Sequence, residues 1–215
     1  PVHHPGEISE IFDAVSYSKG ASVIRMIESY VGEKKFQKGL NQYLKTHKYS
    51  NASTSDLWNA LQKVSGKPVG KIMKNWTSQS GYPVVTVEKK NGKLTLTQER
   101  FYSSPLVKKR ENVSWLIPLS ILTDNKKNPV TTLVDKKSVV LPGFSNTNWI
   151  KANADDTSFV RIRYADELLN AIELPIQKGD TRLNEESRFA IVRDAFALSE
   201  AGYIPTREAL DLLTG

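Results

Sequence analysis

Residues 76–92 read WTSQSGYPVVTVEKKNG, and this stretch decides the fold. Upstream of it, apolar residues recur at the spacing of helices. At Gly81-Tyr82-Pro83 the pattern changes to the β-rich run 84–88. The following Asn91-Gly92 pair is a strong hairpin signal, because both residues tolerate the positive φ angles of a tight turn. The sequence therefore predicts a helical region that ends here and a sheet region that begins here.

The helical region extends over residues 7–79 and carries four stripes of apolar residues at helical spacing. Gly32 is suited to separate the first two helices, and Ser53 or Thr54 to cap the third. We interpret the stripes as core positions, not as cofactor-binding motifs. They lie within residues 23–31, 36–44, 57–64 and 69–76.

The sheet region extends over residues 82–164. Turn residues separate its strand candidates at regular spacing, as in an antiparallel β-sandwich. The candidates are 84–88, a return strand through Leu94 and Leu96, and then 114–123, 130–134, 138–141 and 158–164.

Beyond the sheet region the pattern becomes helical again. A helix over 166–174 is expected to end near Pro175, and a second helix lies between a cap at Asn184 and a stop at Gly202. Helices joined by a short Gly/Pro loop suggest an α-hairpin or a helical-repeat array. The sequence after Tyr164 therefore predicts a second helical region.

The composition of the 215 residues is that of an ordered protein, with a formal net charge of +7. This charge fits a soluble, lysine-rich surface or a surface for nucleic acid or acidic ligands. The basic pairs are scattered and no nucleic-acid motif accompanies them, so we expect no nucleic-acid partner. No run of 18 apolar residues is present, so we expect no membrane span.

Cysteine is absent, which excludes disulfides and thiolate zinc sites. An intracellular, cytoplasmic location suits this composition. Three sequons begin at Asn51, Asn75 and Asn112 and give weak support for secretion.

Candidate chemistry is sparse. His3, His4 and Glu7 offer metal ligands in one short segment, but adjacent histidines point apart, and an exposed loop is the simpler interpretation. The sequence has no H-E-x-x-H, glycine-rich phosphate loop or G-x-S-x-G motif. Tyr17 precedes an apparent helix start at Ser18. A tyrosine hydroxyl there could donate to a developing oxyanion, or the ring could simply be packed.

Several segments together resemble the M1 (gluzincin) family of zinc aminopeptidases, in order and across essentially the whole chain. They are Pro5-Gly6-Glu7-Ile8, residues 12–21 (FDAVSYSKGA), residues 76–83 (WTSQSGYP), residues 98–101 (QERF), residues 115–119 (WLIPL), residues 158–164 (SFVRIRY), and residues 188–196 with 210–213. Ser158 stands where the family often has glycine. This difference puts the exact turn at Ser158 in doubt, but not the assignment to the family. Some details resemble the archaeal, tricorn-interacting members.

The resemblance implies a multidomain α+β fold in three parts. Residues 1–81 would be the C-terminal helical part of a thermolysin-like catalytic domain. Residues 82–164 would be the β-sandwich, and residues 165–215 the beginning of a C-terminal α-helical domain.

The resemblance also implies a function. In the family, the tyrosine of the S-Y-x-K-G motif donates to the tetrahedral intermediate of peptide hydrolysis, and that role falls on Tyr17. The zinc ligands and the general base lie upstream in the family, so we expect an internal piece of a larger enzyme that binds no zinc and is inactive alone. Its partners would be peptide substrates and the missing N-terminal and C-terminal parts. The alternative is a non-enzymatic module that binds peptides or proteins.

Overall fold

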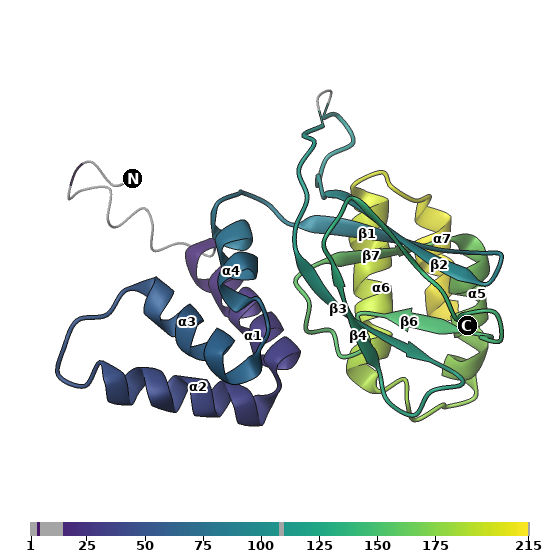
Figure 1. Ribbon diagram of the computed structural model, residues 1–215. Coiled ribbons are helices and arrows are strands. Elements are labelled where there is room, and N and C mark those ends of the chain that lie inside the picture. The colour runs from purple at the N-terminus through teal and green to yellow at the C-terminus, as the bar shows by residue number, and fades with distance from the viewer. Residues whose placement is uncertain (1–3, 5–14, 108–109, 215) are drawn as a thin grey trace. The chain divides into compact units, whose positions relative to one another are not determined.

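The computed structural model describes residue 4, residues 15–107 and residues 110–214 (Figure 1). The chain divides into two compact units. The first comprises the residues up to Trp76 together with Thr157–Phe159, and the second comprises Thr77–Asp156 and the residues from Val160 onward. The first unit is helical, and the second combines strands with helices, so the chain has an α+β fold.

The helical unit contains α1 (Gly20–Val31), α2 (Glu33–Thr46), α3 (Thr54–Ser65) and α4 (Val69–Thr77). Three of the predicted stripes contribute its core, in which Met26, Ile27, Leu61, Ile72 and Trp76 are almost fully buried. The stripe over 36–44 is less buried than predicted: Leu44 is 60% exposed, and the other apolar residues of this stripe are half-buried. Burial of such side chains is the main source of stability, at about 1.5–3 kcal/mol each.

Two predicted helix boundaries in this unit are confirmed. Gly32 separates α1 from α2 with a φ of 91°, a left-handed value that favours glycine. Ser53 precedes α3, and its backbone N–H donates to the Asp56 carboxylate at 2.7 Å. At Gly39, a Cβ would lie 2.8 Å from Leu61 Cδ2, so glycine permits α2 to approach α3 closely.

The second unit contains two sheets. One has the strand order β5-β2-β1-β7 and the other the order β4-β3-β6. The Asn91-Gly92 hairpin is confirmed, because both residues have positive φ and Lys90 pairs with Lys93. The strands are β1 (Pro83–Lys90), β2 (Lys93–Arg100), β3 (Ile117–Thr123), β4 (Val130–Val134), β5 (Ser138–Leu141), β6 (Ile150–Ala152) and β7 (Arg161–Tyr164).

The prediction of an antiparallel sandwich is wrong at one place. β7 pairs with β1 in parallel, from Val84 opposite Arg161 to Val87 opposite Tyr164, so the four-stranded sheet is mixed. The chain passes through both sheets between these strands, which supplies the long connection that parallel neighbours need. β6 was not predicted, because three buried residues carry no alternation.

The C-terminal helices are α5 (Asp166–Gln177), α6 (Glu185–Glu200) and α7 (Thr206–Thr214). The helix predicted over 166–174 does end near Pro175, but it includes this proline and extends to Gln177. The helix ends in a Schellman arrangement, in which Asp180 N–H donates to the Pro175 carbonyl at 2.9 Å. The cap at Asn184 is confirmed: its side chain accepts the Ser187 N–H at 2.9 Å.

The strands and the C-terminal helices share one hydrophobic cluster. Leu122 and Trp149 from the strand region pack with Ile172, Leu183 and Ile191 from the helical region. These two regions therefore form one compact unit, and their division into domains 82–164 and 165–215 remains a prediction.

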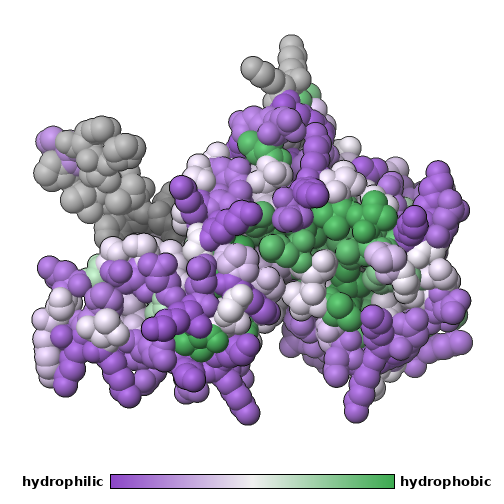
Figure 2. Space-filling model, in the orientation of Figure 1, coloured by the Kyte–Doolittle hydropathy of each residue, from purple (hydrophilic) through white to green (hydrophobic). Residues whose placement is uncertain are grey.

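The described surface is rich in lysine. In α2, Lys34, Lys38 and Lys45 are exposed, and spacings of four and seven residues place them on one side of the helix. Figure 2 shows a mainly hydrophilic face on the helical unit and a hydrophobic area on the visible face of the second unit. Of the helices in the described ranges, none has the length and apolar character to cross a membrane.

Candidate functional site

Tyr17, the predicted oxyanion donor, lies in a π-helical turn. The turn spans Val15–Lys19 and leads into α1, whereas the sequence predicted a helix start at Ser18. The Tyr17 side chain is 62% exposed. Single π-helical turns are rare and occur frequently at functional sites.

The junction between this turn and α1 contains a side-chain hydrogen bond. Ser22 Oγ donates to the Ser18 carbonyl at 2.7 Å. At Gly20, no described atom lies within 4 Å of a Cβ placed there. The motif residues 5–8 and 12–14 lie outside the described residues.

The described residues do not form a zinc site. Within the ranges that the structure covers, no group of three or more His, Cys, Asp or Glu side chains could hold a metal ion. His4 is exposed, and His3 and Glu7 lie outside the described residues. His47 is half-buried, with its ring 5.4 Å from that of Tyr43. These described residues do not fit a zinc ion.

Two of the sequence motifs meet in the sandwich. Gln98 is fully buried in β2. Its Oε1 accepts the Trp115 N–H at 2.7 Å, and its Nε2 donates to the carbonyls of Trp115 and Lys136 at 2.8 and 3.0 Å. Gln79 Nε2 also donates to the Ser114 carbonyl at 3.0 Å. These glutamines therefore join four chain segments, around residues 79, 98, 114–115 and 136, which is a structural role.

Replacement of Gln98 by leucine is expected to destabilise the chain by about 2–3 kcal/mol. Leucine has a similar size, but it removes the hydrogen bonds of Gln98 to the buried Trp115 backbone, and the loss of a partner for a buried polar group costs about 1–3 kcal/mol. Urea unfolding measures the change. Thr97→Val is the control, since the Thr97 hydroxyl makes only an exposed contact with Ser138 at 3.3 Å. Equal stability of the two variants would contradict this role.

Three stacked rings join the sandwich to the turn after α6. The ring centroids of Tyr82 and Phe101 are 5.3 Å apart, and those of Phe101 and Tyr203 are 5.6 Å apart. Gly202, the predicted stop of α6, has a φ of 76°, and a Cβ there would lie 2.9 Å from Pro105 Cβ. The left-handed backbone and the close contact both require glycine, so the stop is confirmed.

Charged groups are buried where β6, β7 and α6 meet. Asp194 of α6 accepts hydrogen bonds from Arg161 Nη1 and from the Ile162 N–H, both at 2.9 Å. Arg193 binds Asp156 at 2.7 Å. Lys151 is buried, and its Nζ donates to the carbonyls of Ala152 and Asn153 at 2.9 and 3.0 Å. The cluster lies within the second unit and holds α6 on the sheet.

Burial lowers the pKa of Lys151 from 10.5 to about 8. Between these values the unfolded chain holds a proton that the folded chain releases, so the free energy of unfolding increases with pH. From pH 7.5 to 9.5 we expect the wild type to gain about 2 kcal/mol relative to Lys151→Met. Urea unfolding at several pH values tests this.

The methionine variant is a fair reference for that comparison. Both carbonyls that accept from Lys151 keep another donor: the Ala152 carbonyl has the Tyr164 hydroxyl at 3.3 Å, and the Asn153 carbonyl has the Asp156 N–H at 3.0 Å. A pH dependence identical in the two proteins would show that Lys151 titrates normally in the folded chain.

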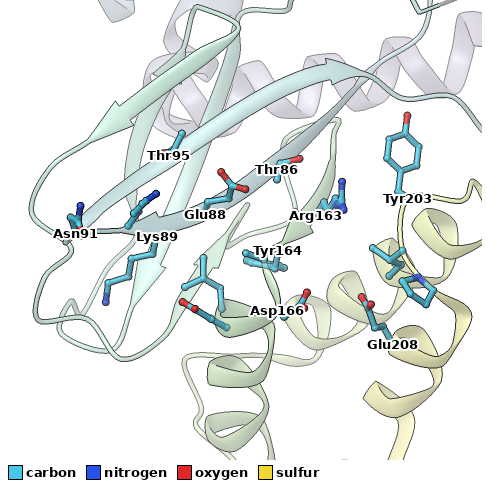
Figure 3. Close-up of a pocket in the computed structure, with 16 residues that line it drawn as sticks. Thr86, Glu88, Lys89, Asn91, Thr95, Arg163, Tyr164, Asp166, Tyr203 and Glu208 are labelled. Atoms are coloured by element: carbon cyan, nitrogen blue, oxygen red, sulfur yellow. The ribbon is translucent and has the colours of Figure 1, made fainter.

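A groove of about 840 Å³ lies over one face of the four-stranded sheet (Figure 3). It extends from Asn91 at the hairpin to Tyr203 and Glu208 at the start of α7. Its charged lining includes Glu88, Arg163 and Asp166. Sequence analysis did not find this groove, because strands, loops and helices distant in sequence contribute to it.

Comparisons with known proteins agree with the order of the motifs. The Peptidase family M1 domain matches residues 1–76, which include Tyr17, and the ERAP1-like C-terminal domain matches residues 149–215. Aminopeptidase M1 of Arabidopsis thaliana is 41% identical over 93% of this chain and 24% of its own length. The chain belongs to the M1 peptidase family.

Other M1-type relatives match along the same extent. Tricorn protease-interacting factor F2 of Thermoplasma volcanium is 39% identical over 98% of this chain and 25% of its own length. Alanine/arginine aminopeptidase of Saccharomyces cerevisiae is 39% identical over all of this chain and 24% of its own length. The chain thus spans about a quarter of the length of these M1 relatives.

Proposed function

We propose that this chain is part of a zinc-dependent aminopeptidase that removes N-terminal residues from peptides. The supporting observation is the continuous similarity, at 39–41% identity, to proteins named aminopeptidases. The segment around Tyr17 lies within the part that matches the Peptidase family M1 domain. Because the chain corresponds to about a quarter of these relatives, the activity belongs to the whole protein.

Within that enzyme, Tyr17 stabilises the tetrahedral intermediate. Its hydroxyl donates a hydrogen bond to the oxyanion that forms when the peptide carbonyl is attacked. Two features of the described residues support this role: the Tyr17 side chain is exposed, and it projects from a π-helical turn. Ser16, Lys19 and Gly20 provide the structural setting of Tyr17, and we assign them no chemical role.

The zinc of this enzyme is held by residues outside the described chain. A catalytic zinc ion activates water and polarises the carbonyl. The described residues contain no cluster that fits it, and the 215 residues contain no H-E-x-x-H motif. The chain by itself is therefore expected to bind no zinc and to hydrolyse no peptides.

The proposed partners follow from the relatives. Peptides are the substrates, and the remaining parts of the same polypeptide complete the catalytic domain and the helical domain. Two similar proteins from Thermoplasma species are named tricorn protease-interacting factors, which favours a protease partner. A cytoplasmic location remains our proposal from the cysteine-free composition. We propose no nucleic-acid or membrane partner.

Hydrolysis of a fluorogenic amino-acid amide in the presence of zinc tests this proposal. The full-length protein that carries this chain should be active, and the 215-residue chain inactive. Zinc-dependent activity of the chain alone would contradict the assignment of the zinc ligands and direct attention to His4 and its neighbours. An inactive full-length protein would favour the non-enzymatic peptide- or protein-binding module.

A further inference from the structure

The groove over the four-stranded sheet contains an open strand edge. β7 pairs with β1 only as far as Val87 opposite Tyr164. The last bond on this side runs from the Ala165 N–H to the Val87 carbonyl at 3.0 Å, and the chain then enters α5. β1 continues to Lys90, so its last three residues, 88–90, have no strand beside them on this edge.

Lys89 is the residue whose backbone faces this edge. Along a strand, successive residues direct their N–H and C=O groups alternately to the two sides. The Val87 carbonyl points to the β7 side, so the N–H and C=O of Lys89 point there too, whereas those of Glu88 and Lys90 point to β2. Outside the β1–β2 ladder, no described group forms a hydrogen bond with the Lys89 backbone.

The Lys89 side chain does not cover its own backbone edge. Its Nζ donates to the Thr147 carbonyl at 2.6 Å, which anchors the side chain to the loop before β6. Figure 3 shows the Lys89 side chain extending away from Glu88 and Thr86. An incoming strand therefore finds a donor and an acceptor at this position.

Arg163 and Glu208, two charged residues of the groove, form no ion pair within 4 Å with another described residue. Arg163 and Glu208 are half-buried and line both the groove and the small cavity beside it. The ion pairs of the described residues involve other side chains, such as Arg161 with Asp194. Since partly buried charges are costly unless paired, a ligand that carries both signs is favoured at this place.

We propose that this groove binds an extended peptide segment that pairs with the Lys89 backbone as a short additional strand. Addition of a strand to an open edge obtains affinity from main-chain hydrogen bonds and specificity from alternate side chains. Side chains two residues apart face the same side, so an acidic residue can meet Arg163 while a basic residue two positions away meets Glu208 or Asp166. The volume of about 840 Å³ lies in the range of ligand-binding pockets.

Titration of the ¹⁵N-labelled chain with a blocked pentapeptide, acetyl-Val-Lys-Val-Glu-Val-amide, tests the proposal by NMR. Saturable shifts should appear at the amides of Lys89, Ala165 and Glu208. A matched pair of variants isolates the backbone edge. Lys89→Ala keeps the backbone N–H and should change the affinity by less than about twofold. Lys89→Pro removes the N–H and should weaken binding about tenfold, which is the effect expected for the loss of one hydrogen bond.

The hairpin should tolerate Lys89→Pro, because the Lys89 N–H does not point to β2 and proline is accepted on strand edges. Should this variant nevertheless unfold, Arg163→Gln provides the second test. It should weaken the glutamate-containing pentapeptide several-fold and leave a pentapeptide with glutamine in that position unaffected.

Some results would overturn the proposal. One is that the titration gives no saturable shifts. A second is that folded Lys89→Pro and Lys89→Ala bind the pentapeptide with equal affinity. A third is that Arg163→Gln weakens the binding of both pentapeptides to the same extent. Free lysine or glutamate binding as tightly as the pentapeptide would also overturn it, since an amino acid does not use the strand edge.

Discussion

Replacement of Asp194 by alanine is expected to destabilise the second unit by about 3–5 kcal/mol, which is typical when one partner of a buried ion pair is removed. The Asp194 carboxylate is 5% exposed and accepts from Arg161, Arg193 and the Ile162 N–H. Without the carboxylate, the guanidinium groups of Arg161 and Arg193 face each other near the buried Lys151. The Ile162 N–H of β7 also loses its acceptor. Alanine has a high helix propensity and does not disturb α6, so the expected effect comes from the loss of the carboxylate.

Urea unfolding of the 215-residue chain measures this loss. Asp211→Ala in α7 is the matched control, because the Asp211 carboxylate is 62% exposed and lies 3.6 Å from Arg207. An exposed pair contributes about 0–1 kcal/mol, so the control should unfold close to the wild type. Similar midpoints for the two variants would show that the buried cluster does not hold α6 on the sheet.

Much of the fold could be predicted from the sequence, because local signals there agree with the tertiary structure. The apolar stripes form α1 to α4, Asn91-Gly92 forms the hairpin, and Asn184 and Gly202 mark the ends of α6. In each case a residue requires a particular backbone angle or supplies a missing hydrogen bond, so a few positions suffice.

The errors arose where partners are distant in sequence. The parallel pairing of β1 with β7 joins residues more than 70 positions apart, and no local pattern distinguishes it from antiparallel pairing. α5 continues for two residues beyond Pro175, although proline usually disfavours such a continuation. Three-residue β6 is defined by its pairing with β3 and not by alternation.

The candidate catalytic residue could be predicted from a sequence motif, but its surroundings could not. Tyr17 was found through the motif that surrounds it, and its exposure and the π-helical turn came only from the structure. The groove along Lys89 could not be predicted, because the open edge exists only where β7 ends beside β1. The clustering of Asp194 with Lys151 likewise depends on α6 packing against the sheet.

Replacement of Tyr17 by phenylalanine in the full-length enzyme is expected to lower kcat about 10²–10³-fold, as removal of one oxyanion donor does. The change removes a single oxygen atom from an exposed ring, so the stability of the fold should not change. KM should change little, because the hydrogen bond forms mainly in the transition state. Tyr49→Phe is the matched control: Tyr49 is 97% exposed and belongs to the same helical unit.

The most direct test of the account is therefore the turnover of a fluorogenic amino-acid amide by three full-length proteins: the wild type, Tyr17→Phe and Tyr49→Phe. The account predicts that the wild type and Tyr49→Phe hydrolyse the amide equally fast, whereas Tyr17→Phe retains the fold and the KM but loses about 10²–10³-fold in kcat. Full turnover by a folded Tyr17→Phe enzyme would contradict the role of Tyr17 in catalysis.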